Sequence, residues 1–269
     1  MSTETTSWRA KLKLGGWYLY TALVSLFLWL PIFAIIIASF YDGQLFAFPF
    51  KFSTRWYEQI LVSSGARRAL VTTLQMSVVV TAVATIFGTA AALGYTRYQF
   101  RGRGVFKILS LLPIFFPLIL LGLGMQMWFS IVGFGTGIVP SIVGQIVWIS
   151  PIVMFVVSIR ALSIDPNIEE AARDLGAGTV TVYKDVVVPP IVDGIIPGAI
   201  FAFILSWNNY YIVANLSGAR SSVTTWMQGQ IQYSFAPLVP ALAASIFYVT
   251  LIGVSVALFI WHWYSSTQA

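Results

Sequence analysis

Carboxylates are the side chains of this sequence best suited to chemistry, and most of them are gathered in one polar stretch. Six of the nine acidic residues lie in it or just after it: Asp165, Glu169, Glu170, Asp174, Asp185 and Asp193. Paired carboxylates serve in general acid–base catalysis, and with histidine or cysteine they hold metal ions. The chain has no cysteine, and its single histidine, His262, lies between two tryptophans at the end of the last apolar segment. We therefore predict no catalytic and no metal-binding residue, and interpret the stretch as a surface that meets a soluble partner.

The rest of the chain is too apolar for a water-soluble fold. Charged residues make up 9% of it, against about 25% in an ordinary soluble domain. Hydrophobic residues make up 58%, and the mean hydropathy is +0.84. The composition predicts an integral membrane protein. We attribute the net charge of +6 to loops that set membrane topology, and expect no nucleic acid partner.

Several segments are long and apolar enough to cross a bilayer as helices, for which roughly 20 residues are needed. The sequence predicts six spans: Trp17–Phe40, Val71–Tyr95, Val105–Phe129, Ile138–Ile159, Ile191–Val213 and Pro240–Trp263. The first is too long for a signal peptide and is interpreted as a retained anchor. We expect an all-α membrane protein with a single transmembrane domain over residues 1–269.

The distribution of basic residues predicts the orientation of these spans. With a cytoplasmic N-terminus, ten of the 15 Lys and Arg residues lie inside and five outside. Cytoplasmic loops carry such an excess, so the sequence predicts that both termini are in the cytoplasm. The acidic loop, residues 163–190, then lies in the cytoplasm between the fourth and fifth spans.

The predicted spans are essentially free of ionisable side chains, with Lys107 and Asp193 at their ends. Ion-coupled carriers usually need such groups near the membrane centre. Their absence disfavours a proton-driven carrier and an enzyme that works within the membrane. The sequence also lacks the Gly-x-x-x-x-Gly-Lys-Ser/Thr loop that binds nucleotide phosphates. Energy for moving a solute must therefore come from another polypeptide.

Neutral polar residues do occur within the predicted spans, notably Trp207, Asn208 and Asn209 in the fifth and Gln126 in the third. An amide in hydrocarbon costs free energy unless it is hydrogen-bonded. These residues either bond neighbouring helices or line a solute path, and the sequence leaves both interpretations open. Adjacent asparagines on a helix point about 100° apart, so one can serve each purpose.

Local signals predict the shape of the acidic loop. Asp165 followed by Pro166 is a favoured helix start. Gly176 is placed to end that helix, because glycine readily adopts the left-handed conformation. A second short helix is expected from about Thr179 to Val187, and Pro189-Pro190 is expected to break it before the fifth span.

The loop also resembles a known signature. Glu170-Ala171-Ala172, three residues, Gly176, nine residues and Val186-Val187-Val188-Pro189 is similar to the Glu-Ala-Ala signature of ATP-binding-cassette importer permeases. The family form is Glu-Ala-Ala-x-x-x-Gly, nine residues, Ile-x-Leu-Pro, and the two departures keep an apolar side chain. The segment from Gly94 to Arg103 resembles the family too, and the chain looks most like the second permease of spermidine/putrescine-type systems.

The resemblance implies a fold, partners and residue roles. It implies the six-helix bundle of a type I (MetI-like) importer permease in the bacterial cytoplasmic membrane. Two cytoplasmic ATPase subunits, a second and different permease chain, and an extracytoplasmic solute-binding protein would complete the complex. ATP and magnesium would bind the ATPases, with no cofactor in this chain. The residues implied to couple to the ATPase are Glu170, Ala171, Ala172, Gly176 and Pro189.

The solute is left open. Spermidine-type permeases tend to carry acidic residues where this chain has Asn208 and Asn209, and neutral amides give a polycation no counter-charge. A polyamine with acid supplied by the partner permease, an opine, a sugar derivative and a phosphonate all remain. Two other classes are kept as alternatives: a self-contained ion-coupled carrier or channel, and a membrane scaffold without transport activity.

Overall fold

The computed structural model describes residues 8–43, 50–165, 167–233 and 237–267. Helices dominate these residues, and the strand-like pairing within them is an isolated antiparallel bridge between Tyr41 and Phe52. The all-α prediction is therefore confirmed. The chain divides into two compact units. The central unit is Ser64–Gln228, and the terminal unit combines Met1–Ser63 with Gly229–Ala269.

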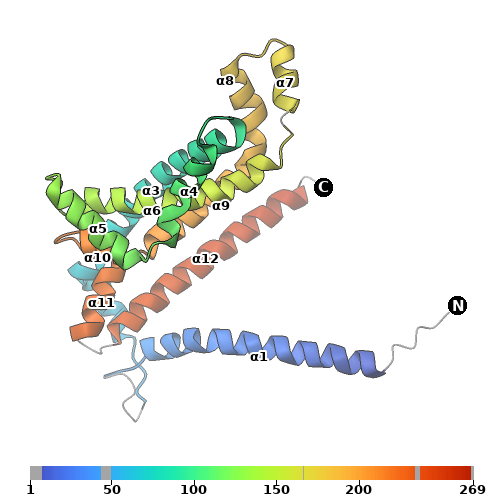
Figure 1. Cartoon of the computed structure of the whole chain (residues 1–269). Helices are drawn as coiled ribbons and strands as arrows, with labels where there is room; N and C mark the ends of the chain where they lie inside the picture. The colour runs from blue at the N-terminus through green and yellow to red at the C-terminus, as the bar shows by residue number, and fades with distance from the viewer. Residues whose placement is uncertain (1–7, 44–49, 166, 234–236, 268–269) are drawn as a thin grey trace. The chain divides into compact units, whose positions relative to one another are not determined.

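Three long helices form the core of the central unit: α3 (Ser64–Arg97), α6 (Ile138–Leu162) and α9 (Val188–Trp207). Figure 1 shows them lying together. Aliphatic side chains form most of the buried core between them, for example Val80, Ile149 and Ile191. A Cβ atom on Gly88 of α3 would lie 2.6 Å from the Val153 Cβ of α6, so glycine is needed for this close approach.

The third predicted span, Val105–Phe129, is broken into two helices. The chain bends by 106° between α4 (Arg103–Phe115) and α5 (Leu118–Ile131). Phe116 between them is extended, with φ −81° and ψ 134°. The prediction of one continuous helix is wrong here because the following Pro117 disfavours a helical conformation at Phe116 and has no N–H to donate.

The fifth predicted span, Ile191–Val213, also differs from the prediction. α9 ends at Trp207, and a short helix α10 (Tyr211–Leu216) follows after Asn208 and Asn209. The two asparagines therefore lie at a helix break and not on a continuous helix.

The acidic loop holds α7 (Asn167–Asp174), α8 (Thr179–Thr181) and one π-helical segment, η1 (Val182–Val187). η1 continues directly into α9, so Pro189-Pro190 does not break the helix, contrary to the prediction. The reason is local: Pro189 lies in the first turn of α9, and the wide π turn before it is closed by the Val188 N–H, which donates to the Tyr183 carbonyl.

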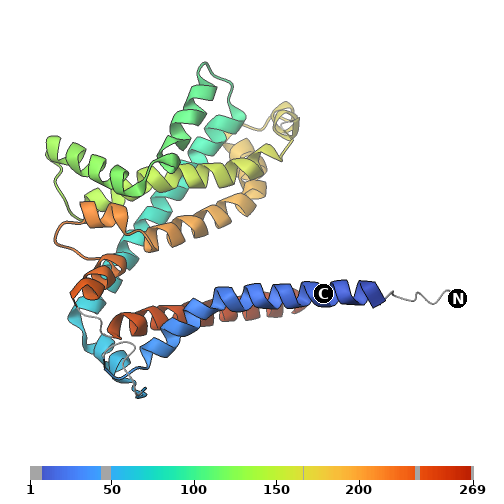
Figure 2. The same ribbon diagram turned by 60° about the horizontal axis from the view of Figure 1, so that its bottom comes forward.

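The terminal unit is built from α1 (Trp8–Ser39), α2 (Arg55–Val62) and α12 (Leu238–Thr267). α1 and α12 contact each other where the rings of Trp29 and Phe247 meet edge to face at 6.5 Å. The two helices overlap in Figure 2, and Figure 1 shows that they diverge away from this contact. The remaining helix, α11 (Val223–Tyr233), follows α10 in the chain.

Several of these helices are long and apolar enough to cross a membrane. Four qualify on their own: Gly15–Ser39, Ser64–Arg97, Ile138–Leu162 and Thr179–Trp207. The bent pair α4–α5 gives a fifth if it is one span. In α12, the segment Leu238–Ile252 is apolar as well. The chain is therefore a multi-pass membrane protein, while the count of six spans and the cytoplasmic placement of both termini stay predictions.

Candidate functional site

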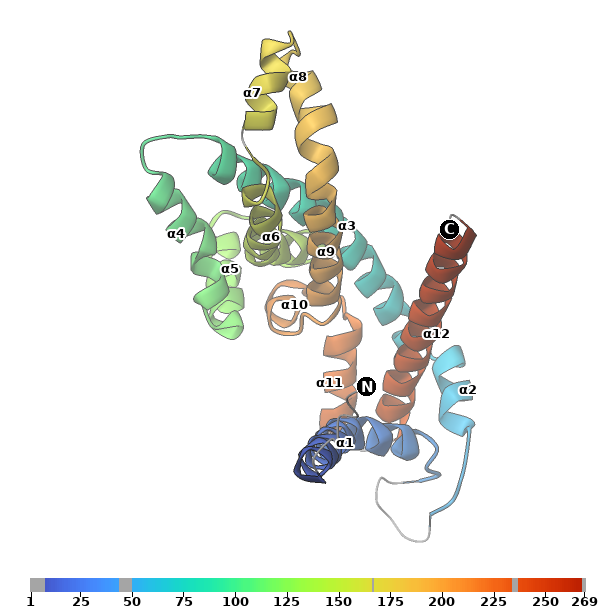
Figure 3. The ribbon, with the colours of Figure 1, turned by 90° about the vertical axis from the view of Figure 1, so that its right-hand side faces the viewer.

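The acidic loop, residues 163–190, projects from the central unit. Figures 1 and 3 show α7 and α8 beyond the rest of that unit. The Asp165 side chain lies at the start of α7 as predicted, and its Oδ1 accepts a hydrogen bond from the Asn167 N–H at 3.0 Å. Pro166, expected at the first helical position, lies outside the described residues.

Gly176 ends α7 in the way the sequence predicts. Its φ is +87°, in the left-handed region that favours glycine. The Gly176 N–H donates to the Arg173 carbonyl at 2.9 Å, and the Ala177 N–H donates to the Ala172 carbonyl at 3.0 Å. These two bonds form a Schellman motif, which satisfies the last carbonyls of α7 and reverses the chain.

One face of α7 is fastened to the end of α3. The Arg97 Nε and Glu169 Oε1 atoms lie 2.8 Å apart, and only 7% and 10% of the two side chains are exposed. The Tyr183 hydroxyl of η1 donates to the Tyr98 hydroxyl at 3.0 Å. The loop is thus tied to α3 by an ion pair and a hydrogen bond. Sequence reasoning missed this contact, although Glu169 adjoins the Glu-Ala-Ala signature and Arg97 lies in the segment that resembles the same family.

The opposite face of the loop is open. Glu170 and Ala171 are exposed, and so are the apolar side chains of Leu175 (89%) and Val180 (80%). Of the other predicted coupling residues, Ala172 is half-buried, Gly176 is exposed at the turn, and Pro189 lies at the start of α9. In the part of the chain that the structure describes, no cluster of His, Cys, Asp and Glu is arranged to hold a metal ion.

The two asparagines of the predicted solute path have different surroundings. Asn208 is exposed, and its Nδ2 donates to the Ile204 carbonyl of its own helix at 3.0 Å. Asn209 is buried, and its Oδ1 accepts from the Ile212 N–H at 3.1 Å, which caps α10. The Asn209 carbonyl accepts a hydrogen bond from the Thr224 hydroxyl. These contacts show that Asn209 holds the helix break together.

A second buried amide lies close to the same break. The Ser206 hydroxyl donates to the Gln145 Oε1 at 2.7 Å, which joins α9 to α6 inside the unit. Of the other predicted path residues, Trp207 stacks on Phe203 at 5.7 Å and Gln126 lies half-buried on α5. Asn209 and Ser206 both lie at the end of α9, where the Asn209 N–H donates to the Ser206 carbonyl at 3.2 Å. Gln126 lies on a separate helix.

The fold and the loop define a multi-pass, all-α membrane protein with a projecting helix–glycine–helix loop. The family model described as "Binding-protein-dependent transport system inner membrane component" matches residues 84–262, and the chain belongs to this family. It is a transmembrane permease subunit of an ABC importer.

Two curated relatives match most of the chain. The "Putrescine transport system permease protein PotI" of Escherichia coli (strain K12) is 29% identical over 229 residues, which cover 82% of this chain and 81% of the relative. The "Spermidine/putrescine transport system permease protein PotC" of the same organism is 24% identical and covers 85% and 87%.

A solved structure shares the fold. It is a chain of the bacterial alginate ABC transporter in complex with an alginate pentasaccharide-bound periplasmic protein. Its TM-score is 0.67 at 18% sequence identity, and the match covers 93% of this chain and 94% of that chain. The similarity of fold extends over nearly the whole length of both chains.

Proposed function

We propose that this permease passes a small polar solute across the bacterial cytoplasmic membrane. The solute is delivered by an extracytoplasmic binding protein, and transport is driven by two cytoplasmic ATPase subunits. A second permease, a different chain, completes the path. Membership of a binding-protein-dependent family and the projecting loop support this assignment.

The open face of the loop is the observation that carries the proposed ATPase contact. Leu175 and Val180 are large apolar side chains, almost fully exposed, at the tip of a segment that projects from the unit. Exposed apolar side chains rimmed by charge are typical of protein interaction sites, and Glu170 and Asp174 supply the rim. Ala171 adds a small side chain that lets a partner backbone approach closely. We assign ATPase coupling to Glu170, Ala171, Ala172, Gly176 and Pro189.

The loop is connected to two core helices, which suggests how the movement of the ATPases reaches the membrane. The helix from Thr179 to Trp207 is continuous, so displacement of the loop acts directly on α9. The Arg97–Glu169 ion pair passes the same displacement to α3. Because packed cores are bistable and not continuously deformable, a shift of both helices switches the bundle between outward-open and inward-open states. This chain does no covalent chemistry in the cycle.

The relatives and the residues of the proposed path bear on the class of solute and not on one compound. The relatives are named for putrescine and spermidine, which are polycations. We assign Trp207, Asn208, Asn209 and Gln126 to the solute path or its support, and these residues carry no charge. Asn208 is exposed, so it is the better candidate for solute contact, while Asn209 supports the break between α9 and α10.

A docking experiment tests the ATPase contact. The Leu175→Asp variant places a carboxylate at the exposed apolar tip and should abolish co-purification of the ATPase subunits and uptake by whole cells. Leu175→Met is the matched control and should keep both. Normal co-purification with Leu175→Asp would remove the loop from the ATPase interface.

A membrane scaffold without transport activity would also use an exposed loop. The two functions differ in energy coupling. In proteoliposomes that contain the whole importer, solute-loaded binding protein should raise ATP hydrolysis above its basal rate. A scaffold would hold the ATPases without this stimulation, and an ion-coupled carrier would stop when the ion gradient is collapsed.

A further inference from the structure

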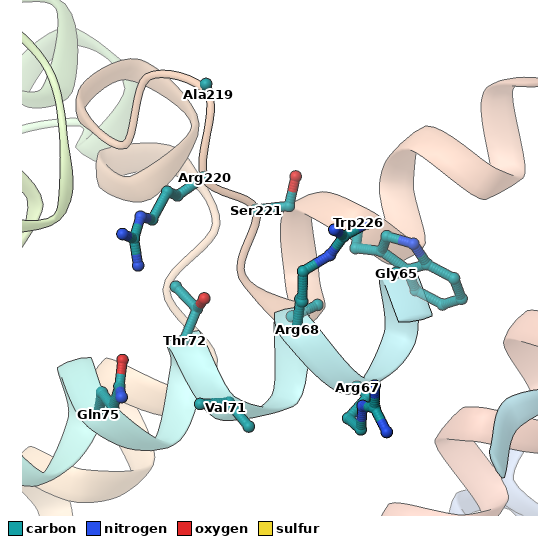
Figure 4. Close-up of a pocket in the computed structure, with 11 residues that line it drawn as sticks. Gly65, Arg67, Arg68, Val71, Thr72, Gln75, Ala219, Arg220, Ser221 and Trp226 are labelled. Atoms are coloured by element: carbon teal, nitrogen blue, oxygen red, sulfur yellow. The ribbon is translucent and has the colours of Figure 1, made fainter. Parts of the chain in front are cut away.

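The central unit contains an open cleft at the beginning of α3, the end of that helix far from the acidic loop. The cleft has a volume of about 880 Å³ and is lined by the first turns of α3, by residues 219–221 and by Trp226 of α11 (Figure 4). We call it the arginine cleft, after its charged lining residues Arg67, Arg68 and Arg220.

The described residues that line the cleft include no carboxylate. The described carboxylates of the central unit lie at residues 165–193, close to the far end of α3. Arg67 and Arg97 are 30 residues apart on one helix, which corresponds to about 45 Å. Charges interact strongly only within about 8–10 Å in physiological salt. Among the residues that the structure describes, the ion pairs leave out all three cleft arginines.

Two of the three guanidinium groups extend over the cleft from different elements. Figure 4 shows Arg220 reaching from the loop toward Thr72, and Arg68 extending from α3 toward Trp226 and Ser221. Arg67 points away at the lower edge of the view. Arg68 Nη2 makes one long contact, 3.5 Å to the Ser64 hydroxyl. Both guanidinium groups therefore keep donors free for a ligand.

The walls of the cleft are held in place by one buried and two partly buried hydrogen bonds. The Val223 N–H donates to the Thr73 hydroxyl of α3 at 2.8 Å. The Thr224 hydroxyl donates to the Asn209 carbonyl at 3.2 Å. The Ser222 N–H donates to the Thr225 hydroxyl at 2.8 Å. The segment that carries Arg220 is thus fixed against α3 before a ligand arrives, which lowers the ordering cost of binding.

We propose that the arginine cleft binds the carboxylate or phosphate group of a small anionic or zwitterionic solute. This inference rests on the proposed transport function and narrows its solute class. Guanidinium groups present a planar fork of donors that matches carboxylate and phosphate oxygens. The cleft volume falls within the range of about 300–1,000 Å³ common for small-molecule sites, and Trp226 offers an apolar surface beside the charges. A polyamine is repelled by the same arginines.

Acidic side chains of a docked binding protein and the phosphates of lipids share this chemistry. A lipid phosphate has the right charge and is distinguished by experiment.

The test measures binding to the full-length chain in nanodiscs of phosphatidylcholine, with inorganic phosphate and succinate as probes. Calorimetry should show saturable binding of one or both anions and none of spermidine. The double variant Arg68→Gln/Arg220→Gln should weaken anion binding by about tenfold or more, since two charge-assisted contacts are lost. Arg101→Gln, at an exposed arginine just beyond the other end of α3, is the matched control and should bind as the unaltered chain does.

Three results would overturn the proposal: no anion binding, anion binding undiminished in the double variant, or spermidine binding that the double variant removes. Loss of probe binding in nanodiscs of phosphatidylglycerol would assign the cleft to lipid headgroups and overturn the solute assignment as well. Co-purification of the ATPases is measured separately on the unaltered chain. Its failure would reject the proposed function, whereas intact co-purification without anion binding would reject the cleft alone.

Discussion

The buried Arg97–Glu169 pair offers the sharpest test of how the acidic loop is fixed to the bundle. Replacing Glu169 with the isosteric Gln removes one charge and leaves Arg97 buried without a counter-ion. Breaking a buried pair in this way costs about 3–5 kcal/mol. The same change at Asp193, whose pair with Arg160 is 75% and 43% exposed, should cost less than about 1 kcal/mol.

These energies translate into a measurable difference in thermal stability. For a chain of this size, 1 kcal/mol shifts the midpoint of unfolding by roughly 2–4 °C. Glu169→Gln should therefore lower the midpoint by roughly 6–20 °C, and Asp193→Asn by less than about 4 °C. The assay follows tryptophan fluorescence of the purified full-length chain in detergent. The two variants make the same chemical change, so the comparison isolates burial.

A double variant separates the cost of a buried unpaired charge from the net contribution of the ion pair to stability. Arg97→Met with Glu169→Leu removes both charges and keeps apolar volume, so most of the lost stability should return. If Glu169→Gln and Asp193→Asn had equal small effects, or if the double variant were no more stable than Glu169→Gln, the reasoning would be refuted. ATPase stimulation by solute-loaded binding protein should also fall in Glu169→Gln, because α7 then moves without α3.

Two further predictions follow from the turn and the helix break. Gly176→Ala forces a side chain into the left-handed region at a cost of about 1–2 kcal/mol, although its Cβ meets no other atom within 4 Å. Amide exchange at Ala177 should rise about 5–30-fold, and unchanged exchange would mean that the turn relaxes freely. Asn209→Ala removes the cap of α10 and should cost about 1–2 kcal/mol, measured by denaturant unfolding. Asn208→Ala should be neutral in stability and lower uptake, and the reverse pattern would exchange the roles assigned to the two residues.

The sequence by itself determined the features that depend on local chemistry and composition. Hydropathy predicted a helical membrane protein. An apolar segment of about 20 residues crosses a bilayer as a helix, because a helix satisfies every backbone N–H and C=O group within the segment. The resemblance of the segment from Glu170 to Pro189 to a known signature predicted the family. Asp165 and Gly176 predicted where α7 begins and ends, because a cap and a left-handed turn are decided by the residue at that position and its immediate neighbours.

Only the tertiary structure decided the features that depend on which side chains meet across the fold. The break at Pro117 had a local signal that was overlooked, but the turn at Asn208 and Asn209 depends on partners such as Thr224, which is distant in sequence. The pairing of Glu169 with Arg97 joins residues 72 positions apart. The sequence showed a cluster of acidic residues and scattered arginines. The fold paired Glu169 with Arg97 and Asp193 with Arg160, and the ion pairs among the described residues include none of the three cleft arginines. The physical reason is the length of α3: its two ends lie too far apart for the charges at one end to neutralise those at the other.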